Sequence, residues 1–225
     1  MKKLVPLLLL LVLMLTGCQT GLFTILWVLR GDDEPPKYDI LLKGEKRVAV
    51  VPRSVYSNSL ELRNAPREIA QHIHSILDNP KVVKNKKLRF VEQSKVESWL
   101  DHANNNFDTF LEVGRDKSIQ ADVVIGFDII EFQIRDPLNA SLIQGRCVVE
   151  VRAVDCATGK IEASETLTIV DPPSMPLHNN PRLEPVFRTQ FIGVVAEQIA
   201  MLFYPHNPNR KRRIDADALE MQRIN

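Results

Sequence analysis

The chain has 225 residues, of which 44% are hydrophobic and 25% charged, and its formal net charge at neutral pH is +1. This charge lacks the basic footprint of a nucleic-acid-binding protein, and the apolar fraction is too high for an intrinsically disordered chain. Three cysteines are too few for a disulfide scaffold. The length therefore fits one globular domain with accessory segments.

The first 17 residues have the order of a bacterial export signal. Lys2-Lys3 is a positively charged start, and residues 4–15 are an apolar run rich in leucine. The run ends in Leu15-Thr16-Gly17-Cys18, which resembles the lipobox of bacterial lipoproteins, where a small pair precedes an obligatory cysteine. The resemblance implies that the Cys18 thiol receives a diacylglyceryl group. It also implies that a lipoprotein signal peptidase cuts between Gly17 and Cys18.

A second apolar run, at residues 22–29, leaves the form of the anchor open. Residues 4–29 together would be long enough to span a bilayer if the leader stayed uncleaved, although the weakly apolar residues 16–21 interrupt that span. In a third arrangement the second run lies on the membrane surface with Trp27 at headgroup level. Every arrangement places Arg30 and the chain after it outside the cytoplasm.

The segments on either side of the domain both contain charged stretches. Residues 18–45 comprise the lipidated cysteine, the apolar run and a tether that carries three acidic residues and two prolines at 31–37. Gln19 follows the cysteine, and by resemblance to sorting in enteric bacteria this favours the outer membrane, with the domain facing the periplasm. Residues 205–225 form a basic tail with Arg210-Lys211-Arg212-Arg213. We expect a flexible, solvated tail, or one attracted to anionic headgroups if it reaches back to the membrane.

We expect the globular domain at residues 46–204, with elements in the order β-α-β-α-α-β-β-β-α. The continuous apolar run 47–52 predicts a strand buried on both faces, and Ile69, Ile73 and Leu77 lie at helical spacing within a predicted helix at 66–78. The remaining elements of this half are predicted as a strand at 88–92, helices at 94–102 and 109–119, and a strand at 121–130.

The second half of the domain predicts a meander. Residues 146–155 and 161–170 alternate apolar and polar side chains, and a turn signal at 157–160 joins them. Residues 171–185 hold five prolines and predict an irregular crossing, which the helix 186–204 follows. The fold class is therefore α/β (α+β), a mixed sheet of about five strands with helices packed on it.

Three sequence segments of this domain resemble one family of bacterial envelope proteins. They are VAVVP at 48–52, ADVVIGF at 121–127, and the turn Asp155-Cys156-Ala157-Thr158-Gly159-Lys160, which fits a D-x-x-T-G-x pattern. The family includes the curli secretion channel subunit (CsgG) and the amino-terminal domain of TolB. The resemblance covers residues 46–204 and implies an anticodon-binding-domain-like fold without catalytic residues. A curli-type channel subunit adds membrane-crossing hairpins, and we find none beyond those that the sheet itself needs.

Residues that could carry chemistry are scattered. His72 and His74 are two apart, so a helix points them to different faces, and we expect no metal site. Asp128 and Glu131 have an odd spacing, which predicts opposite faces of a strand, while Asp122 is expected to cap or start that strand. No nucleophile motif or phosphate loop occurs, so no catalytic residue and no cofactor are predicted.

The two cysteines of the domain are predicted not to pair. Cys147 and Cys156 fall in one expected strand, where nine steps of about 3.3 Å separate them by roughly 30 Å. A disulfide needs Cα atoms within about 7 Å of each other. We expect two free, partly buried thiols.

These observations predict a non-enzymatic cell-envelope lipoprotein. Its partners would be membrane lipid, through the acyl chains (palmitate among them) on Cys18, and another envelope protein or further copies of itself. Nucleic acid and small-molecule substrates are not expected. The alternative is a subunit of a CsgG-like export channel or trans-envelope assembly, and a hydrolase is the weakest class.

Overall fold

The computed structural model describes residues 33–42, 44–54, 64–85, 87–103, 106–136, 138–139, 141–173, 176–178 and 183–207. They belong to two compact units. Pro36–Tyr204 is the larger and is called the sheet domain below, and the smaller is described at residues 33–35 and 205–207. The leader, Cys18, the apolar run at 22–29 and the basic tail from 208 lie outside the described residues. Within the described ranges, no helix has both the length and the apolar character that a membrane crossing requires.

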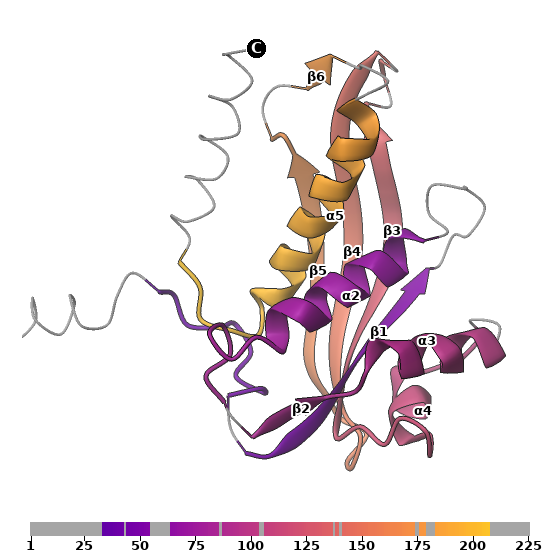
Figure 1. Cartoon of the computed structure of the whole chain (residues 1–225), viewed down its shortest axis with the longest axis vertical. Coiled ribbons are helices and arrows are strands. Elements are labelled where there is room, and N and C mark those ends of the chain that lie inside the picture. Colours follow the sequence, from indigo (N-terminus) through magenta and orange to yellow (C-terminus); the bar gives the residue numbers. More distant parts are fainter. Residues whose placement is uncertain are drawn as a thin grey trace, which may run out of the picture. The chain divides into compact units, whose positions relative to one another are not determined.

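One mixed sheet of six strands is the centre of the sheet domain, with strand order β2-β1-β3-β4-β5 (Figure 1). The strands are β1 (Lys46–Ser54), β2 (Leu88–Phe90), β3 (Val123–Arg135), β4 (Leu142–Asp155), β5 (Ile161–Asp171) and β6 (Leu177–His178). β1 is parallel to β2 and β3, whereas β3, β4 and β5 form an antiparallel meander. The predicted fold class and the mixed sheet are confirmed. The addition is β6, a two-residue strand on β4 within the proline-rich crossing.

Helices pack on both faces of the sheet. α2 (Ala65–Leu77) and α5 (Leu183–Ala200) pack on one face, and α3 (Gln93–His102) and α4 (Phe110–Arg115) pack on the other (Figure 1). β1 explains this arrangement, because Val48 and Val50 join the α2–α5 core while Ala49 and Val51 join the α3–α4 core, all of them fully buried. A strand apolar on both faces needs a cover on each side.

The packing of α5 on the meander depends on a glycine. Gly145 on β4 faces the ring of Phe191, and a Cβ at this position would lie 2.5 Å from the ring. On its other side α5 meets α2 through Arg188, which donates two hydrogen bonds of 2.9 Å to the Glu68 carboxylate. α5 therefore joins β4 to α2.

The sheet domain begins earlier than the expected start at residue 46. Leu41 is fully buried, and the Tyr38 ring lies 6.1 Å from that of Phe203. The Tyr38 N–H also donates to the carbonyl oxygen of Leu202 at 2.9 Å. The compact unit accordingly starts at Pro36. The apolar run at residues 38–42 (YDILL) is too short to have a periodicity from which this packing could be predicted.

Candidate functional site

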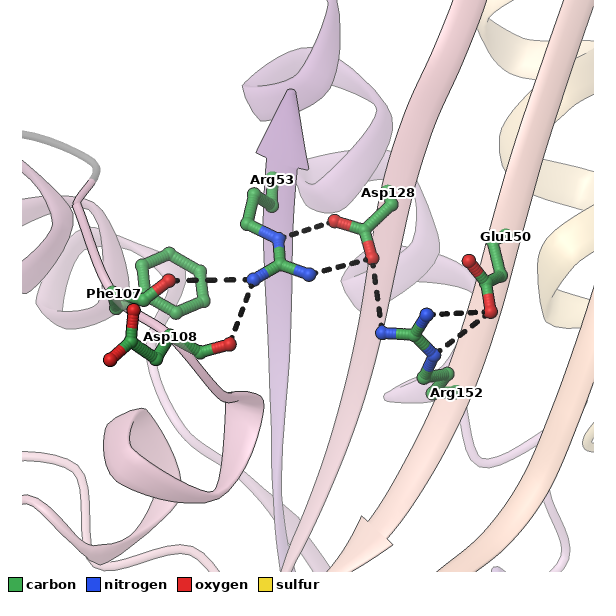
Figure 2. Close-up of polar contacts among 6 residues, drawn as sticks. All are labelled: Arg53, Phe107, Asp108, Asp128, Glu150 and Arg152. Atoms are coloured by element: carbon green, nitrogen blue, oxygen red, sulfur yellow. Dashed lines mark hydrogen bonds and ion pairs between the residues drawn. The ribbon is translucent and has the colours of Figure 1, made fainter. Parts of the chain in front are cut away.

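The most enclosed charged group of the described residues is the carboxylate of Asp128, whose residue is 3% exposed. It lies on β3, on the face that carries α3 and α4. Arg53, from the end of β1, donates Nε and Nη2 to its two oxygens at 2.5 and 3.0 Å (Figure 2). Arg152 on β4 donates Nη1 to Oδ2 at 3.4 Å. Three neighbouring strands thus meet at one carboxylate.

Arg53 also holds the segment before α4. Its Nη1 donates to the carbonyl oxygens of Phe107 and Asp108 at 3.4 and 3.1 Å (Figure 2). The guanidinium carbon lies 5.4 Å from the ring centre of Phe107 and 5.0 Å from that of Phe110, which suits a cation–π contact. Hydrogen bonding to Asp128 raises the pKa of Arg53, so this group is permanently charged.

Glu150 is the last charged group of this set of contacts. Arg152 donates Nη2 and Nε to the Glu150 carboxylate at 2.6 and 3.0 Å. Two arginines and two carboxylates have a net charge of zero, and each carboxylate has a guanidinium partner. A general base or an anion site would need a group with free bonding capacity. The network, here called the Asp128 network, is therefore a structural link between β1, β3 and β4.

A β-bulge corrects one prediction about β3. Ile129 pairs with Val149 and Glu131 with Val148, so Ile130 is an extra residue in β3. Asp128 and Glu131 consequently share one face, and their predicted placement on opposite faces is wrong, because a bulge shifts the two-residue alternation by one. Glu131 still stays apart from the Asp128 network, since it accepts from Arg146 Nε at 3.1 and 3.2 Å.

The D-x-x-T-G-x turn is stabilised by hydrogen bonds within the turn and from α4. Asp155 Oδ1 accepts both the N–H and the hydroxyl of Thr158 at 2.8 Å, and Gly159 has φ of +74°, which favours glycine. The hydrogen bond from the Thr158 N–H lowers the pKa of Asp155. Arg115 of α4 donates to the carbonyl oxygens of Cys156 and Ala157 at 2.8 and 3.3 Å. These contacts give the motif a structural role, which is to form the β4–β5 turn and to attach it to α4.

A shallow cavity of about 510 Å³ opens on the sheet domain, with both charge signs in its lining. It is lined by Lys37, Tyr38, Asp39, Ile40, Gly44, Lys46, Asp155 and Glu162. A hydrogen bond to Glu165 raises the pKa of Lys37, while that of Asp155 is lowered. Both groups are shifted toward permanent charge, whereas a general acid or base needs a pKa near the working pH.

The histidines predicted to lack a metal role lie on α2. His72 is exposed, while the ring of His74 is packed edge-on against Phe90 at 5.6 Å. Within the described ranges, no three histidine, cysteine or acidic side chains gather as they would around a metal ion. Asp122 has the predicted role at the start of its strand, because its carboxylate accepts the N–H of Arg47 at 2.7 Å.

Cys147 and Cys156 are free, as predicted, and both are buried, Cys147 completely and Cys156 with 6% of its surface exposed. Cys147 belongs to the α2–α5 core and Cys156 to the α3–α4 core, on the opposite side of the sheet. Burial raises the pKa of Cys147 to about 12 and that of Cys156 to about 11. Neither thiol is therefore a nucleophile at neutral pH.

The Asp128 network was not identified from the sequence, although a signal for it was present. Arg53 directly follows the apolar run of β1, and Asp128 interrupts that of β3. Charges at buried strand positions need partners, and these two residues pair across parallel strands. The predicted lipidation residues Leu15, Thr16, Gly17 and Cys18 lie outside the described residues.

No known protein-family model and no curated protein matches the chain. Among solved structures, it is similar to lipoprotein GNA1162 from Neisseria meningitidis, at 14% identity over 67% of this chain and 98% of that one, with a TM-score of 0.40. The PelC dodecamer from Paraburkholderia phytofirmans is 15% identical over 76% of this chain and 96% of that one, also at 0.40. A candidate lipoprotein from Caulobacter crescentus is 9% identical over 78% and 91%, at 0.35. Likenesses this slight transfer neither a partner nor an activity.

Proposed function

We propose that this chain is a non-enzymatic cell-envelope lipoprotein, anchored by acylated Cys18, whose α/β domain outside the cytoplasm binds or assembles with other envelope components. The observation that carries the anchor is the leader that ends in Leu15-Thr16-Gly17-Cys18. Gln19 directs the mature protein to the outer membrane, facing the periplasm. The acyl chains on Cys18 hold it there, because two or more chains give stable attachment where one does not.

The meander supports a binding role for the domain. β5 is a strand of 11 residues at the end of the sheet, and no described strand pairs with its outer edge. An open edge offers backbone donors and acceptors to another chain. On the face that carries α3 and α4, β5 exposes Ser164, Thr166 and Thr168 opposite Arg152, Glu150 and Val148 of β4. Edge and face together form a polar surface, the β5 surface, that fits a protein partner.

The charged groups described above support a role without catalysis. The Asp128 network is closed, both thiols are buried, and the cavity groups with shifted pKa values are held in their charged forms. The export-channel alternative requires strands outside the sheet, and the six described strands all belong to it.

Lipidation is tested with the full chain and its Cys18→Ser variant, expressed in a diderm bacterium supplied with an alkyne-tagged fatty acid. We expect a labelled, processed wild-type protein in the outer-membrane fraction, with a mature N-terminus at Cys18 by mass spectrometry. The variant should remain unprocessed and unlabelled. An unlabelled wild type that retains residues 1–17 would establish the transmembrane anchor instead.

Binding is tested with a photo-crosslinking amino acid at Thr168, on the β5 surface, and at Ser98 of α3 as an exposed control. We expect adducts with another envelope protein or with a second copy from position 168 alone. Equal adducts from both positions, or none from position 168, would contradict the β5 surface. Light scattering and negative-stain images of the detergent-extracted protein test the channel alternative, since a large ring would favour it.

A further inference from the structure

The two ends of the sheet differ in how they are protected against pairing with another strand. β2, at one end, has three residues, and very short edge strands are one of the protections found in monomeric proteins. β5, at the other end, has 11 residues (Figure 1). Its residues 163–171 pair with β4 in continuous register and include no lysine or proline. This stretch therefore lacks the bulges, lysines and prolines that commonly keep an edge from pairing.

Hydrogen bonds on the two sides of β4 fix which backbone groups of β5 face outward. The Cys156 N–H donates to the carbonyl oxygen of Asp122 at 2.8 Å, on the β3 side. The Asp155 N–H donates to that of Lys160 at 3.0 Å, on the β5 side. Because these directions alternate along a strand, the odd-numbered residues of β4 bond to β5, and their partners are the odd-numbered residues 163–171. The remaining residues direct their N–H and C=O groups out of the sheet: Ser164, Thr166, Thr168 and Val170.

One of these outward groups is occupied by the sheet domain itself. The Tyr38 hydroxyl donates to the carbonyl oxygen of Ser164 at 2.9 Å and to Glu165 Oε2 at 3.1 Å. Lys37 Nζ donates to the same carboxylate oxygen at 2.5 Å. The first contact agrees with the outward direction of the Ser164 carbonyl, and the last neutralises the only charged side chain of residues 163–170. The open part of the edge therefore starts at Thr166, which is exposed.

The open part is complementary to itself when two copies run antiparallel about a two-fold axis at Leu167. Thr166 of each copy is then opposite Thr168 of the other, and each such pair exchanges both of its N–H···O bonds. Threonine pairs stabilise a sheet, and Glu165 is opposite Ile169 rather than another carboxylate. We propose that β5 pairs in this register with β5 of a second copy, which gives a two-fold dimer with one continuous sheet. The inference rests on the proposed function, which assigns binding to the β5 surface.

The neighbouring registers are less favourable. An axis at Thr168 would place Glu165 opposite Asp171, and like charges directly opposite each other destabilise a sheet. An axis at Thr166 would place Thr168 opposite Ser164, whose carbonyl oxygen already accepts a hydrogen bond. A strand of a different protein would need a matching edge of its own, whereas a second copy always carries one. The observations therefore favour a second copy as the partner.

The first experiment measures the molar mass of the detergent-extracted full chain by light scattering. The Thr168 N–H points out of the sheet, so Thr168→Pro removes a donor from the dimer and leaves the β4–β5 ladder intact. We expect two chains per particle for the wild type and for Thr168→Val, which keeps the backbone donor, and one chain for Thr168→Pro. Circular dichroism verifies that the proline variant is folded. A monomeric wild type, or a folded proline variant that stays dimeric, would overturn the proposal.

The second experiment tests the register with exposed cysteines and does not depend on the proline variant. Thr166→Cys and a differently tagged Thr168→Cys are mixed and mildly oxidised, and buried Cys147 and Cys156 stay unreactive. In the proposed register the Cα atoms of the mixed pair lie about 5.5 Å apart, within reach of a disulfide. Identical variants meet only on the diagonal, at about 7–8 Å. We expect mixed dimers in excess of both like dimers, and none from Ser98→Cys on α3. Equal yields of all three dimers would overturn the register.

Crosslinking at position 168 separates failure of the dimer from failure of the β5 surface. A monomeric wild type that crosslinks there to a different envelope protein would overturn the dimer and support the β5 surface. A monomeric wild type without adducts would overturn both.

Discussion

Asp128 on β3 and Glu150 on β4 are directly opposite each other, and Arg152 donates hydrogen bonds to both carboxylates. Two like charges in such a cross-strand pair repel each other. Arg152 joins them on one side, and Arg53 neutralises Asp128 on the other. Both arginines are therefore needed to offset the repulsion between the Asp128 and Glu150 carboxylates.

Asp128→Asn should strongly destabilise the sheet domain. The side chain of Asp128 is 4% exposed, and breaking an enclosed ion pair from one side leaves uncompensated charge, which costs about 3 kcal/mol. The free energy of unfolding in urea measures this loss. Glu131→Gln is the control, because the more exposed Glu131–Arg146 pair should contribute less than about 1 kcal/mol. Similar losses of unfolding free energy for both variants would show that the Asp128 network stabilises the domain no more than the exposed Glu131–Arg146 pair does.

Gly126→Ala should destabilise by overpacking. A Cβ at Gly126 would lie 2.3 Å from the Phe110 ring, and crowding of this kind costs about 1–3 kcal/mol. Gly193→Ala in α5 is the matched control, since nothing lies within 4 Å of its Cβ position and alanine favours a helix by up to about 1 kcal/mol. The thermal midpoint should fall in the first variant and rise in the second. A rise in both would mean that α4 shifts without cost.

Asp155→Asn should weaken the β4–β5 turn in a pH-dependent way. The folded-state pKa of Asp155 is lowered, so its contribution is present above the unfolded value of about 3.9 and is lost as the pH falls through the lower folded value. The gap in thermal midpoint between wild type and variant should thus be full at pH 6 and narrow below pH 4. A gap that widened toward low pH would contradict this sign.

The thiols of Cys147 and Cys156 should be unreactive toward thiol reagents in the folded protein. Their pKa values are raised to about 12 and about 11 by burial, so almost no thiolate exists at pH 7.5. A chromogenic disulfide reagent should react with neither in native buffer and with both after unfolding in guanidinium. Detection of fewer than two thiols in the unfolded, unreduced domain would show a disulfide and contradict the free pair.

The sequence by itself determined the features that depend on neighbours along the chain. Apolar periodicity located the strands and helices and the mixed sheet, because burial of one or both faces leaves a repeat of 2 or 3.6 residues. The Asp155–Thr158 turn was likewise visible, since its hydrogen bonds span three residues. The predicted lipidation of Cys18 rests on the same kind of local order, and it stays a prediction.

Only the tertiary structure decided which distant residues meet. Arg53 and Asp128 are 75 residues apart and become partners because β1 and β3 pair in one register. Because of the bulge at Ile130, Glu131 lies on the same face of β3 as Asp128. The local sequence pattern does not predict such an inserted residue. Leu41 belongs to the core and Tyr38 packs against it beside Phe203, although both precede the first strand that the sequence predicted. Periodicity shows which side chains of a segment share a face. Which strands pair, in what register, and which helices cover them depend on the packing of the whole domain.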